Sequence, residues 1–475
     1  MMVDRVFCVD FGSAYTKVAL RRDPQARGAL VACSDTAIEL WAPTVVAADW
    51  SKGEARLDFG YKAAGIKPGG KITVYTDFKK NLFSTAVDTS SPPPLDALLQ
   101  SEEFETLAAK YSVLPPQLAA LRMMAGAARA LVGGTADRTG SAEGRKQEEA
   151  KRLAYHYFKW LRERVLDACN RLPDSALRYE DIPLRVAVPV LGEGDLAQHP
   201  GCQRLREALN STGWKLDDRL FVSEPESNAV GILTQASNLL TKKQKINLGE
   251  MFGKGPLITV IKGDVHHPTY RALVIDVGAF TTDFAALTID TGGTQFDTSN
   301  GAGFGIVQHS VRLGMTTLDA SVRGGFSVEK QGMLDALSRK EFEEFQFSAY
   351  TEGIGYRLPG TRVAIGGESD RVAVQTAMAD FTNRLTDETT KFCAALEPAS
   401  MQELILTGGG SSIPAVRDAV IAAAQTDGKP FVKTHAPDLK RGKAGSPLVD
   451  KLDTQFTRGG SALGGASIYF ERGYY

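Results

Sequence analysis

The chain has 475 residues, of which 43% are hydrophobic and 23% charged, and its formal net charge is −1. These values exclude a disordered chain and give no electrostatic reason to expect nucleic acid or an anionic membrane as a partner. Five scattered cysteines without a Cys-x-x-Cys pair favour a reducing compartment, and we find neither a signal peptide nor an apolar run that could span a bilayer. We therefore expect a cytoplasmic protein without membrane insertion, built as two domains or as one large two-lobed unit.

The first predicted element is a β-hairpin at residues 6–18. Its apolar first strand ends at Asp10, the turn contains Gly12 and Ser13, and the returning strand carries Lys17. Glycine lets backbone N–H groups approach an anion closely, and a carboxylate at a strand end can hold the water shell of Mg²⁺. The pattern therefore suggests a phosphate-binding turn.

The same pattern returns at residues 272–287. An apolar run at 273–275 ends at Asp276, and the turn that follows contains Gly278, Thr281 and Asp283. Alone, this segment is equally well explained as an ordinary hairpin with a polar tip. Its repetition favours two similar half-domains that face one another across a shared Mg²⁺–phosphate group.

Between the hairpins we predict a strand at 41–48, and within residues 73–83 Lys79 and Lys80 come just after a short extended run. A lysine pair at a turn is usually only solvated. Residues 84–150 form an insertion, with two or three helices at 95–132 and a mobile loop at 133–145.

Strands and helices then alternate, which predicts an α/β architecture. An apolar stripe predicts a core-facing helix at about 148–172. Strands follow at 184–190 and 221–225, the second with Glu224 at its end. Helices are expected at 203–213 and from 229–233 onward, and the His266–His267 pair is expected to lie in a loop rather than to bind metal.

The last third of the chain contains a helix at 378–396 and a third glycine-containing turn. A strand at 404–407 leads into Gly408, Gly409 and Gly410, and a helix begins at Pro414. Such a turn can lie flat against a base or sugar. Glycines within 458–469 predict a helix that packs closely against another backbone.

These segments, in this order, resemble the nucleotide-binding fold shared by actin, hexokinase and the seventy-kilodalton heat-shock chaperones. The resemblance implies a two-lobed actin-like ATPase fold with duplicated ribonuclease H-like halves and a nucleotide cleft between the lobes. Residues 1–235 would form lobe I, with 84–150 inserted and 459–475 completing it, and residues 236–458 would form lobe II. The heat-shock branch fits best, since 73–80 resembles its segment with the catalytic lysine and 223–232 resembles its Glu-Pro crossing segment. No peptide-binding domain is expected after the second crossing helix.

The resemblance implies ATP and Mg²⁺ as ligands and assigns roles to particular residues. Lys79 would steady the γ-phosphate, and Glu224 would orient the attacking water. The implied catalytic residues are Lys79, Glu224, Asp276 and Thr281; the implied metal-site residues are Asp10, Asp276 and Asp283; the implied nucleotide-binding residues are Asp10, Gly12, Ser13, Ala14, Tyr15, Lys17, Gly278, Ala279, Phe280, Thr282, Gly408, Gly409, Gly410, Ser412 and Asp453.

Some positions depart from the chaperone pattern. Lys17 is more typical of actin-like members, Ala279 and Phe280 replace glycines, and Ser412 stands where chaperones usually carry an arginine. We expect an ATP-hydrolysing conformational switch that acts on an unidentified protein partner. An actin-like ATPase that self-assembles into filaments is the alternative, and a small-molecule kinase is a third possibility for which we find no sugar-binding motif.

Overall fold

The computed structural model describes most of the chain outside the 84–150 insertion and several connecting segments. The described residues are 5–22, 29–31, 33, 40–52, 54–84, 142–171, 177–192, 194–235, 245–247, 259–261, 269–290, 304–352, 355–357, 364–396, 403–425, 433–435 and 459–466. The helices predicted at 95–132, the His266–His267 loop and Asp453 lie outside these residues. So does the loop predicted at 133–145, except for its last four residues, which are helical.

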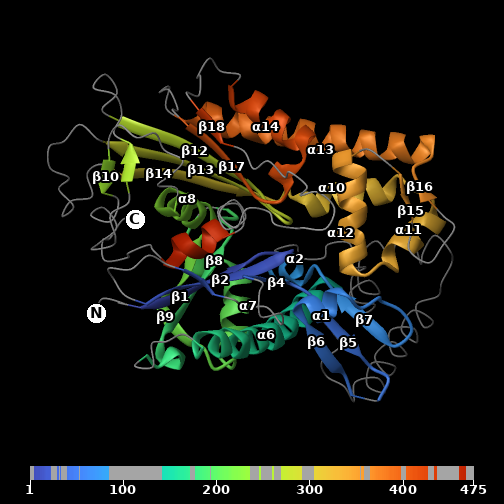
Figure 1. Cartoon of the computed structure of the whole chain (residues 1–475), viewed down its shortest axis with the longest axis horizontal. Helices are drawn as coiled ribbons and strands as arrows, with labels where there is room; N and C mark the ends of the chain where they lie inside the picture. The colour runs from blue at the N-terminus through green and yellow to red at the C-terminus, as the bar shows by residue number, and fades with distance from the viewer. Residues whose placement is uncertain are drawn as a thin grey trace, which may run out of the picture.

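Two sheets form the centre of a mixed α/β structure (Figure 1). The first runs in the order β3 (Ala29–Val31), β2 (Tyr15–Arg21), β1 (Val6–Phe11), β8 (Pro183–Val188) and β9 (Lys215–Ser223), and β4 (Trp41–Pro43) also pairs with β2. The second runs in the order β14 (Phe304–Val311), β13 (Thr282–Asp290), β12 (Thr269–Val277), β17 (Glu403–Thr407) and β18 (Lys433–His435).

The two sheets have the same topology. In each, an antiparallel hairpin (β1–β2 or β12–β13) is followed on the side of its first strand by two parallel strands. The registers also agree, because Asp10 lies opposite Lys17 and Asp276 lies opposite Asp283. Both predicted hairpins are therefore confirmed, and they occupy equivalent places in the two halves.

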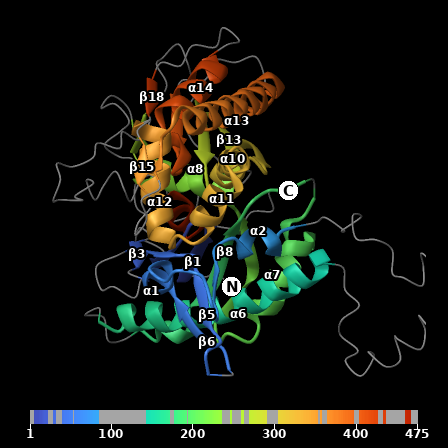
Figure 2. The same ribbon diagram turned by 90° about the vertical axis from the view of Figure 1, so that its right-hand side faces the viewer.

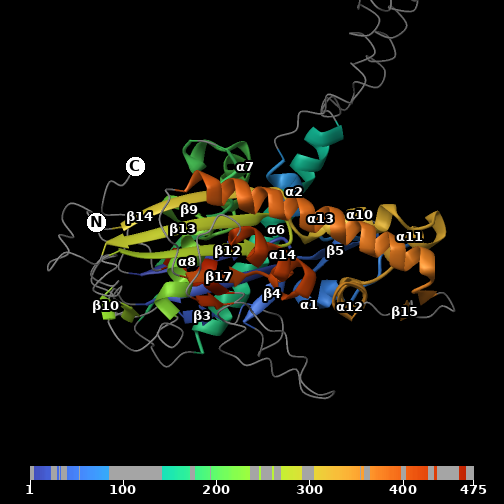
Figure 3. The same ribbon diagram turned by 90° about the horizontal axis from the view of Figure 1, so that it is seen from above.

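Helices cover the outer faces of both sheets (Figures 1 and 3). Among the described helices the two longest are α6 (Ala142–Cys169) and α13 (Glu368–Ala395), with 28 residues each, and α7 (Pro200–Leu209) and α14 (Pro414–Gln425) lie beside them. Ala154, Phe158, Leu161 and Val165 of α6 are fully buried, as the apolar stripe predicts. Each sheet thus has its own hydrophobic core.

Smaller elements extend from each half on the same side of the molecule (Figure 2). The first half carries α1, α2 and a three-stranded sheet, and the second carries three short helices and a strand pair. The bounds are β5 (Val46–Asp49), β6 (Arg56–Phe59), α1 (Gly60–Ala64), β7 (Ile72–Tyr75), α2 (Phe78–Leu82), α10 (Met315–Gly324), α11 (Val328–Asp335), α12 (Arg339–Phe347), a π-helical turn (Ser348–Glu352), β15 (Tyr356–Arg357) and β16 (Ala364–Ile365); 3₁₀ turns lie at Tyr179–Asp181, Leu196–Gln198 and Gly410–Ser412, and β10 (Lys245–Asn247) pairs with β11 (Thr259–Ile261).

Several sequence-based boundaries were wrong. The helix predicted at 378–396 is α13, which begins earlier, at Glu368, and the helix predicted at about 148–172 is α6, which runs from Ala142 to Cys169. The strand predicted at 41–48 is two strands, β4 and β5, because Thr44 breaks the run by donating its N–H to Ala14 O and its hydroxyl to Gly12 O. The helix predicted at 203–213 ends at Leu209. Glu224 does not end a strand but is the first residue of α8 (Glu224–Gln235).

α8 lies between the two sheets and crosses the helix at 459–466 (Figure 1). The two helices meet backbone to backbone, as the glycines predict. A Cβ atom on Gly231 would lie 1.9 Å from Gly460 O, and one on Gly464 would lie 1.7 Å from Ser227 O. Only glycine permits this approach. None of the helices in the described ranges has the length and apolar character needed to cross a bilayer.

Candidate functional site

The turns of both hairpins open into one cavity of about 290 Å³. Nearly all of the predicted site residues line it: Asp10, Gly12, Ser13, Ala14, Tyr15, Lys17, Lys79, Glu224, Asp276, Gly278, Ala279, Phe280, Thr281, Asp283, Gly408, Gly409, Gly410 and Ser412. Thr282 is the exception among the described residues. It is fully buried beside the cavity, and its hydroxyl donates to Leu313 O.

The first hairpin brings a lysine and a carboxylate together at the cavity. Lys17 Nζ lies 2.9 Å from Asp10 Oδ2, and both side chains are largely buried. Asp10 Oδ1 and the hydroxyl of Ser13 are also buried, and neither has a hydrogen-bond partner among the described residues. Because buried polar atoms are normally paired, these two atoms suit a ligand or ordered water in the cavity.

The second hairpin holds its two carboxylates with neutral donors. Asn228 of α8 donates through Nδ2 to Asp276 Oδ2 (2.7 Å) and to Thr407 Oγ1 (2.8 Å). The hydroxyl of Thr281 donates to Asp283 Oδ2 (3.1 Å), and that of Ser310 donates to Asp283 Oδ1. These neutral donors fix the orientation of the Asp276 and Asp283 carboxylates.

A second lysine–carboxylate pair lies at the wall formed by the first half. Lys79 comes from α2, Glu224 from the start of α8, and Lys79 Nζ is 3.2 Å from Glu224 Oε2. Only 3% of the Lys79 side chain and 11% of the Glu224 side chain is exposed. Lys79 is therefore buried, although two adjacent lysines at a turn are usually both solvated. Its neighbour Lys80, by contrast, is exposed.

Six carboxylates line the cavity against three basic side chains, Lys17, Lys79 and Arg339, so its wall carries an excess of acid. Burial, reinforced by the neighbouring Asp283, raises the pKa of Asp276 to about 7. Burial also raises the pKa of Asp283 to about 6, against the hydrogen bonds from Ser310 and Thr281, and it holds the pKa of Glu224 well above its ordinary value. Buried negative charge of this kind is relieved by a cation.

The carboxylates suit a hydrated cation better than a directly coordinated one. No group of three or more His, Cys, Asp or Glu side chains converges closely enough to hold a metal ion in the described ranges. The unpaired Asp10 Oδ1 and the carboxylates of Asp276 and Asp283 nonetheless line one cavity. Mg²⁺ commonly keeps several of its waters, so this donor set fits an ion held through its water shell.

The third glycine turn packs directly against the second hairpin. Gly408 has a φ of +81°, and a Cβ atom there would lie 2.2 Å from Asp276 Oδ1. Both the backbone conformation and the contact require glycine. The three glycines of this turn line the cavity next to the carboxylates.

Sequence reasoning missed the side chains that α10 and α12 contribute to the opposite wall. Tyr15 OH donates to Glu343 Oε2 (2.7 Å), and Arg339 Nε donates to Glu343 Oε1 (3.0 Å), so this contact joins the two halves. Asp319 accepts hydrogen bonds from Gln346 and Tyr350, and burial raises its pKa to about 6.

The spacing of Arg339, Glu343, Gln346 and Tyr350 places them on one face of α12 and the turn that follows, which is the only signal that the sequence offers for them. Asn228 was also missed, although it lies four residues after Glu224 and thus on the same face of α8. Comparison of the chain with models of known protein families and with curated proteins finds no match.

Proposed function

We propose that the chain binds Mg²⁺–ATP between its two halves, hydrolyses it, and acts as a nucleotide-dependent switch. One observation carries this proposal: two hairpins in equivalent places of two like sheets direct their Asp–Gly turns into one cavity. The shared strand order and the crossing of α8 with the helix at 459–466 support an actin-like, two-lobed fold of duplicated halves. The Lys79–Glu224 pair supports the heat-shock branch of that superfamily.

Backbone N–H groups of the two turns, together with the hydroxyls of Ser13 and Thr281, hold the phosphates in this proposal. Asp10, Asp276 and Asp283 hold Mg²⁺ through its water shell. When bound, the ion offsets negative charge on the transferring phosphoryl group.

In hydrolysis, a water attacks the γ-phosphorus, and the bond from that phosphorus to the β–γ bridging oxygen breaks to give ADP and phosphate. Glu224 faces the cavity and orients the water. Lys79, held at Glu224, stabilises the charge on the γ-phosphoryl oxygens, and such stabilisation matters most in the transition state.

The same arrangement makes a switch. Tyr15 and Glu343, which both line the cavity, join the two halves by a hydrogen bond. In this proposal the two turns are also joined through the phosphates that they bind. Loss of the γ-phosphate removes contacts to both halves and so weakens their closure. A protein partner that distinguishes the two states receives the signal, and self-assembly into filaments is the alternative output.

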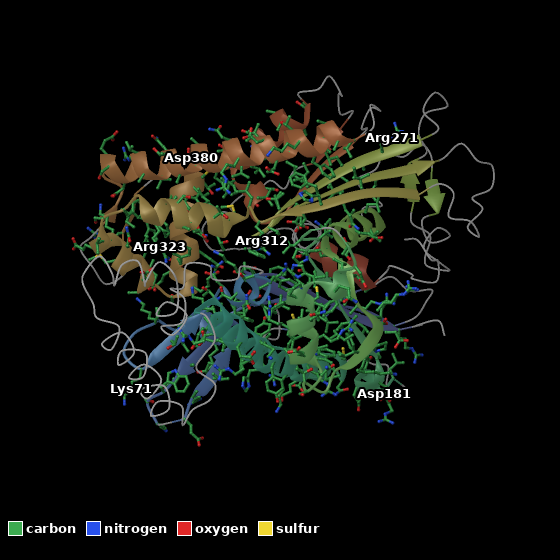
Figure 4. The ribbon with its side chains drawn as sticks, turned by 180° about the vertical axis from the view of Figure 1, so that it is seen from behind. Lys71, Asp181, Arg271, Arg312, Arg323 and Asp380 are labelled. Carbon is green, nitrogen blue, oxygen red and sulfur yellow. The ribbon has the colours of Figure 1, made fainter. Side chains whose placement is uncertain are left out.

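The test is phosphate release from ATP by the purified chain, with and without Mg²⁺. We expect Mg²⁺-dependent release that the Asp10→Asn/Asp276→Asn double variant abolishes. Asp380→Asn is the matched control, since Asp380 lies exposed on the outer helix α13 (Figure 4). Release at the wild-type rate by the double variant would refute the site.

Two further measurements separate the alternatives. Sedimentation in ATP and in ADP distinguishes a filament-forming ATPase, which would pellet in a nucleotide-dependent way. Phosphate release without any added acceptor excludes a small-molecule kinase as the main activity.

A further inference from the structure

Side chains on one face of strand β14 and at its end connect the two halves by hydrogen bonds. Gln308 and Ser310 are alternate residues of β14, and Arg312 directly follows the strand. Their side chains therefore point to the same face. Each of the three makes a hydrogen bond to the first half. Arg312 accordingly lies between the two halves in Figure 4. We call these three residues the β14 bridge.

Ser310 is the centre of the bridge. It is 4% exposed, it lies opposite Asp283 in the strand register, and its hydroxyl accepts the N–H of Val190 at 2.9 Å. A serine hydroxyl has a single proton, and Ser310 donates it to Asp283 Oδ1. One hydroxyl therefore ties backbone of the first half to a cavity carboxylate of the second.

Gln308 contacts the residue that precedes Glu224. The hydroxyl of Ser223 donates to Gln308 Oε1 and accepts the N–H of Glu226 at 3.2 Å. Ser223 is thus the N-cap of α8, the helix in which Glu224 is the first residue. Gln308 consequently fixes the end of the helix that presents Glu224 to the cavity.

Arg312 contacts the helix that carries Lys79. Its Nη2 atom donates to Phe83 O at 3.0 Å, and the N–H of Phe83 donates to Lys79 O at 3.0 Å as α2 ends. Arg312 therefore holds the end of α2 against the second half.

We propose that the β14 bridge is a set of positioning residues that fixes the Lys79–Glu224 pair against Asp283. This inference rests on the proposed hydrolysis. The bridge residues contact no reacting atom. Gln308 acts next to Glu224, Ser310 on Asp283, and Arg312 at the end of the helix that carries Lys79. A reaction between two halves of a protein depends on their alignment, and a displacement of about 1 Å can slow an enzyme about 100-fold.

The experiment compares Ser310→Ala with Ser310→Thr, which keeps the hydroxyl, and with His309→Ala, a change at the exposed neighbour on the other face of β14. Gln308→Met, which removes the acceptor of the Ser223 hydroxyl, tests the bridge at a second point. Three quantities are measured in each protein: ATP affinity, single-turnover hydrolysis, and deuterium exchange in peptides that contain Val190.

We expect Ser310→Ala to slow hydrolysis about 10- to 100-fold while ATP affinity changes less than about threefold, because the bridge sets alignment rather than binding. Exchange at Val190 should quicken, since its N–H loses its acceptor. Ser310→Thr should restore both quantities, Gln308→Met should slow hydrolysis as well, and His309→Ala should behave as wild type.

Normal hydrolysis by both Ser310→Ala and Gln308→Met would overturn the positioning role alone. Unchanged exchange at Val190 in Ser310→Ala would overturn the bridging contact. A wild-type chain that hydrolyses no ATP would overturn the proposed function, and the positioning role with it.

Discussion

Lys17 and Asp10 face each other across hairpin β1–β2, with Lys17 Nζ 2.9 Å from Asp10 Oδ2. In hairpin β12–β13 the equivalent positions hold two acids, Asp283 and Asp276. The halves are therefore alike in topology but differ in local charge, because the first pair joins an acid to a base and the second joins two acids. Excess negative charge gathers on the second hairpin, which is where the pKa values of both carboxyl groups are raised.

The first prediction concerns this lysine–carboxylate pair. Lys17→Met should destabilise the ligand-free chain by about 3 kcal/mol, because it leaves Asp10 buried without its cation. The double variant Lys17→Met/Asp10→Asn should regain most of that loss. Urea unfolding of the wild type, both single variants and the double variant measures the coupling, and additive single effects would argue against a stabilising pair.

The second prediction concerns Lys79. Lys79→Met should lower the hydrolysis rate about 10²- to 10³-fold and change ATP affinity only a few-fold, since a cation near the γ-phosphoryl group acts mainly on the transition state. Lys80→Met is the matched control, being the next residue in α2 and exposed. If Lys79→Met keeps its turnover while Lys17→Met loses it, Lys17 is the cation that acts on the transferring group.

The third prediction concerns pH. The pKa of Asp276 is about 7 in the folded chain, from burial first and then from Asp283, against about 4 in an unfolded chain. Between these values the folded state binds more protons than the unfolded state, so this group makes stability fall as pH rises from about 4 to 7. Asp276→Asn should remove that slope.

We therefore expect Asp276→Asn to be more stable than wild type at pH 8, by about 2–4 kcal/mol, and to lose most of this advantage at pH 5. Urea unfolding of both proteins at the two pH values, without Mg²⁺, gives the difference. A constant difference between the two proteins would show that Asp276 does not titrate in this range.

The fourth prediction concerns the crossing helices. Gly464→Ala should prevent folding or reduce stability by more than about 3 kcal/mol, because its Cβ would overlap the carbonyl of Ser227. Gly332→Ala is the control: it lies in α11 with no atom within 4 Å of the added Cβ, and it should stabilise by about 0.5–1 kcal/mol. Thermal unfolding compares the two, and equal midpoints would contradict the close crossing.

The sequence predicted correctly the elements that depend only on residues close together in the chain. The two hairpins carry strand, Asp and Gly in adjacent positions, and the stripe of α6 repeats over several turns. Glu224 was misplaced even though its signal is local. Ser223 is an N-cap residue, and Pro225 in the first turn marks a helix start, so the strand had to end before Glu224.

The rest of the site depends on how distant segments pack. Asn228 reaches Asp276 over 48 residues of sequence, and Tyr15 reaches Glu343 over 328. No periodicity in either segment encodes its partner, because each contact follows from the approach of the two halves. For the same reason the sequence of α12, although rich in Glu and Phe, does not show that this helix forms a wall of the cavity.

The backbone contact between α8 and the helix at 459–466 also limits how this protein can change over evolutionary time. An ordinary core contact tolerates a larger side chain when its neighbour becomes smaller. At Gly231 and Gly464 the nearest neighbours are main-chain atoms, which cannot become smaller, and at Gly460 the nearest neighbour is the side chain of Asn228, which binds Asp276. Compensation would require the two halves to move as bodies, which would disturb the cavity between them. We therefore expect natural variants to accumulate changes almost anywhere else on these helices before they alter these three positions.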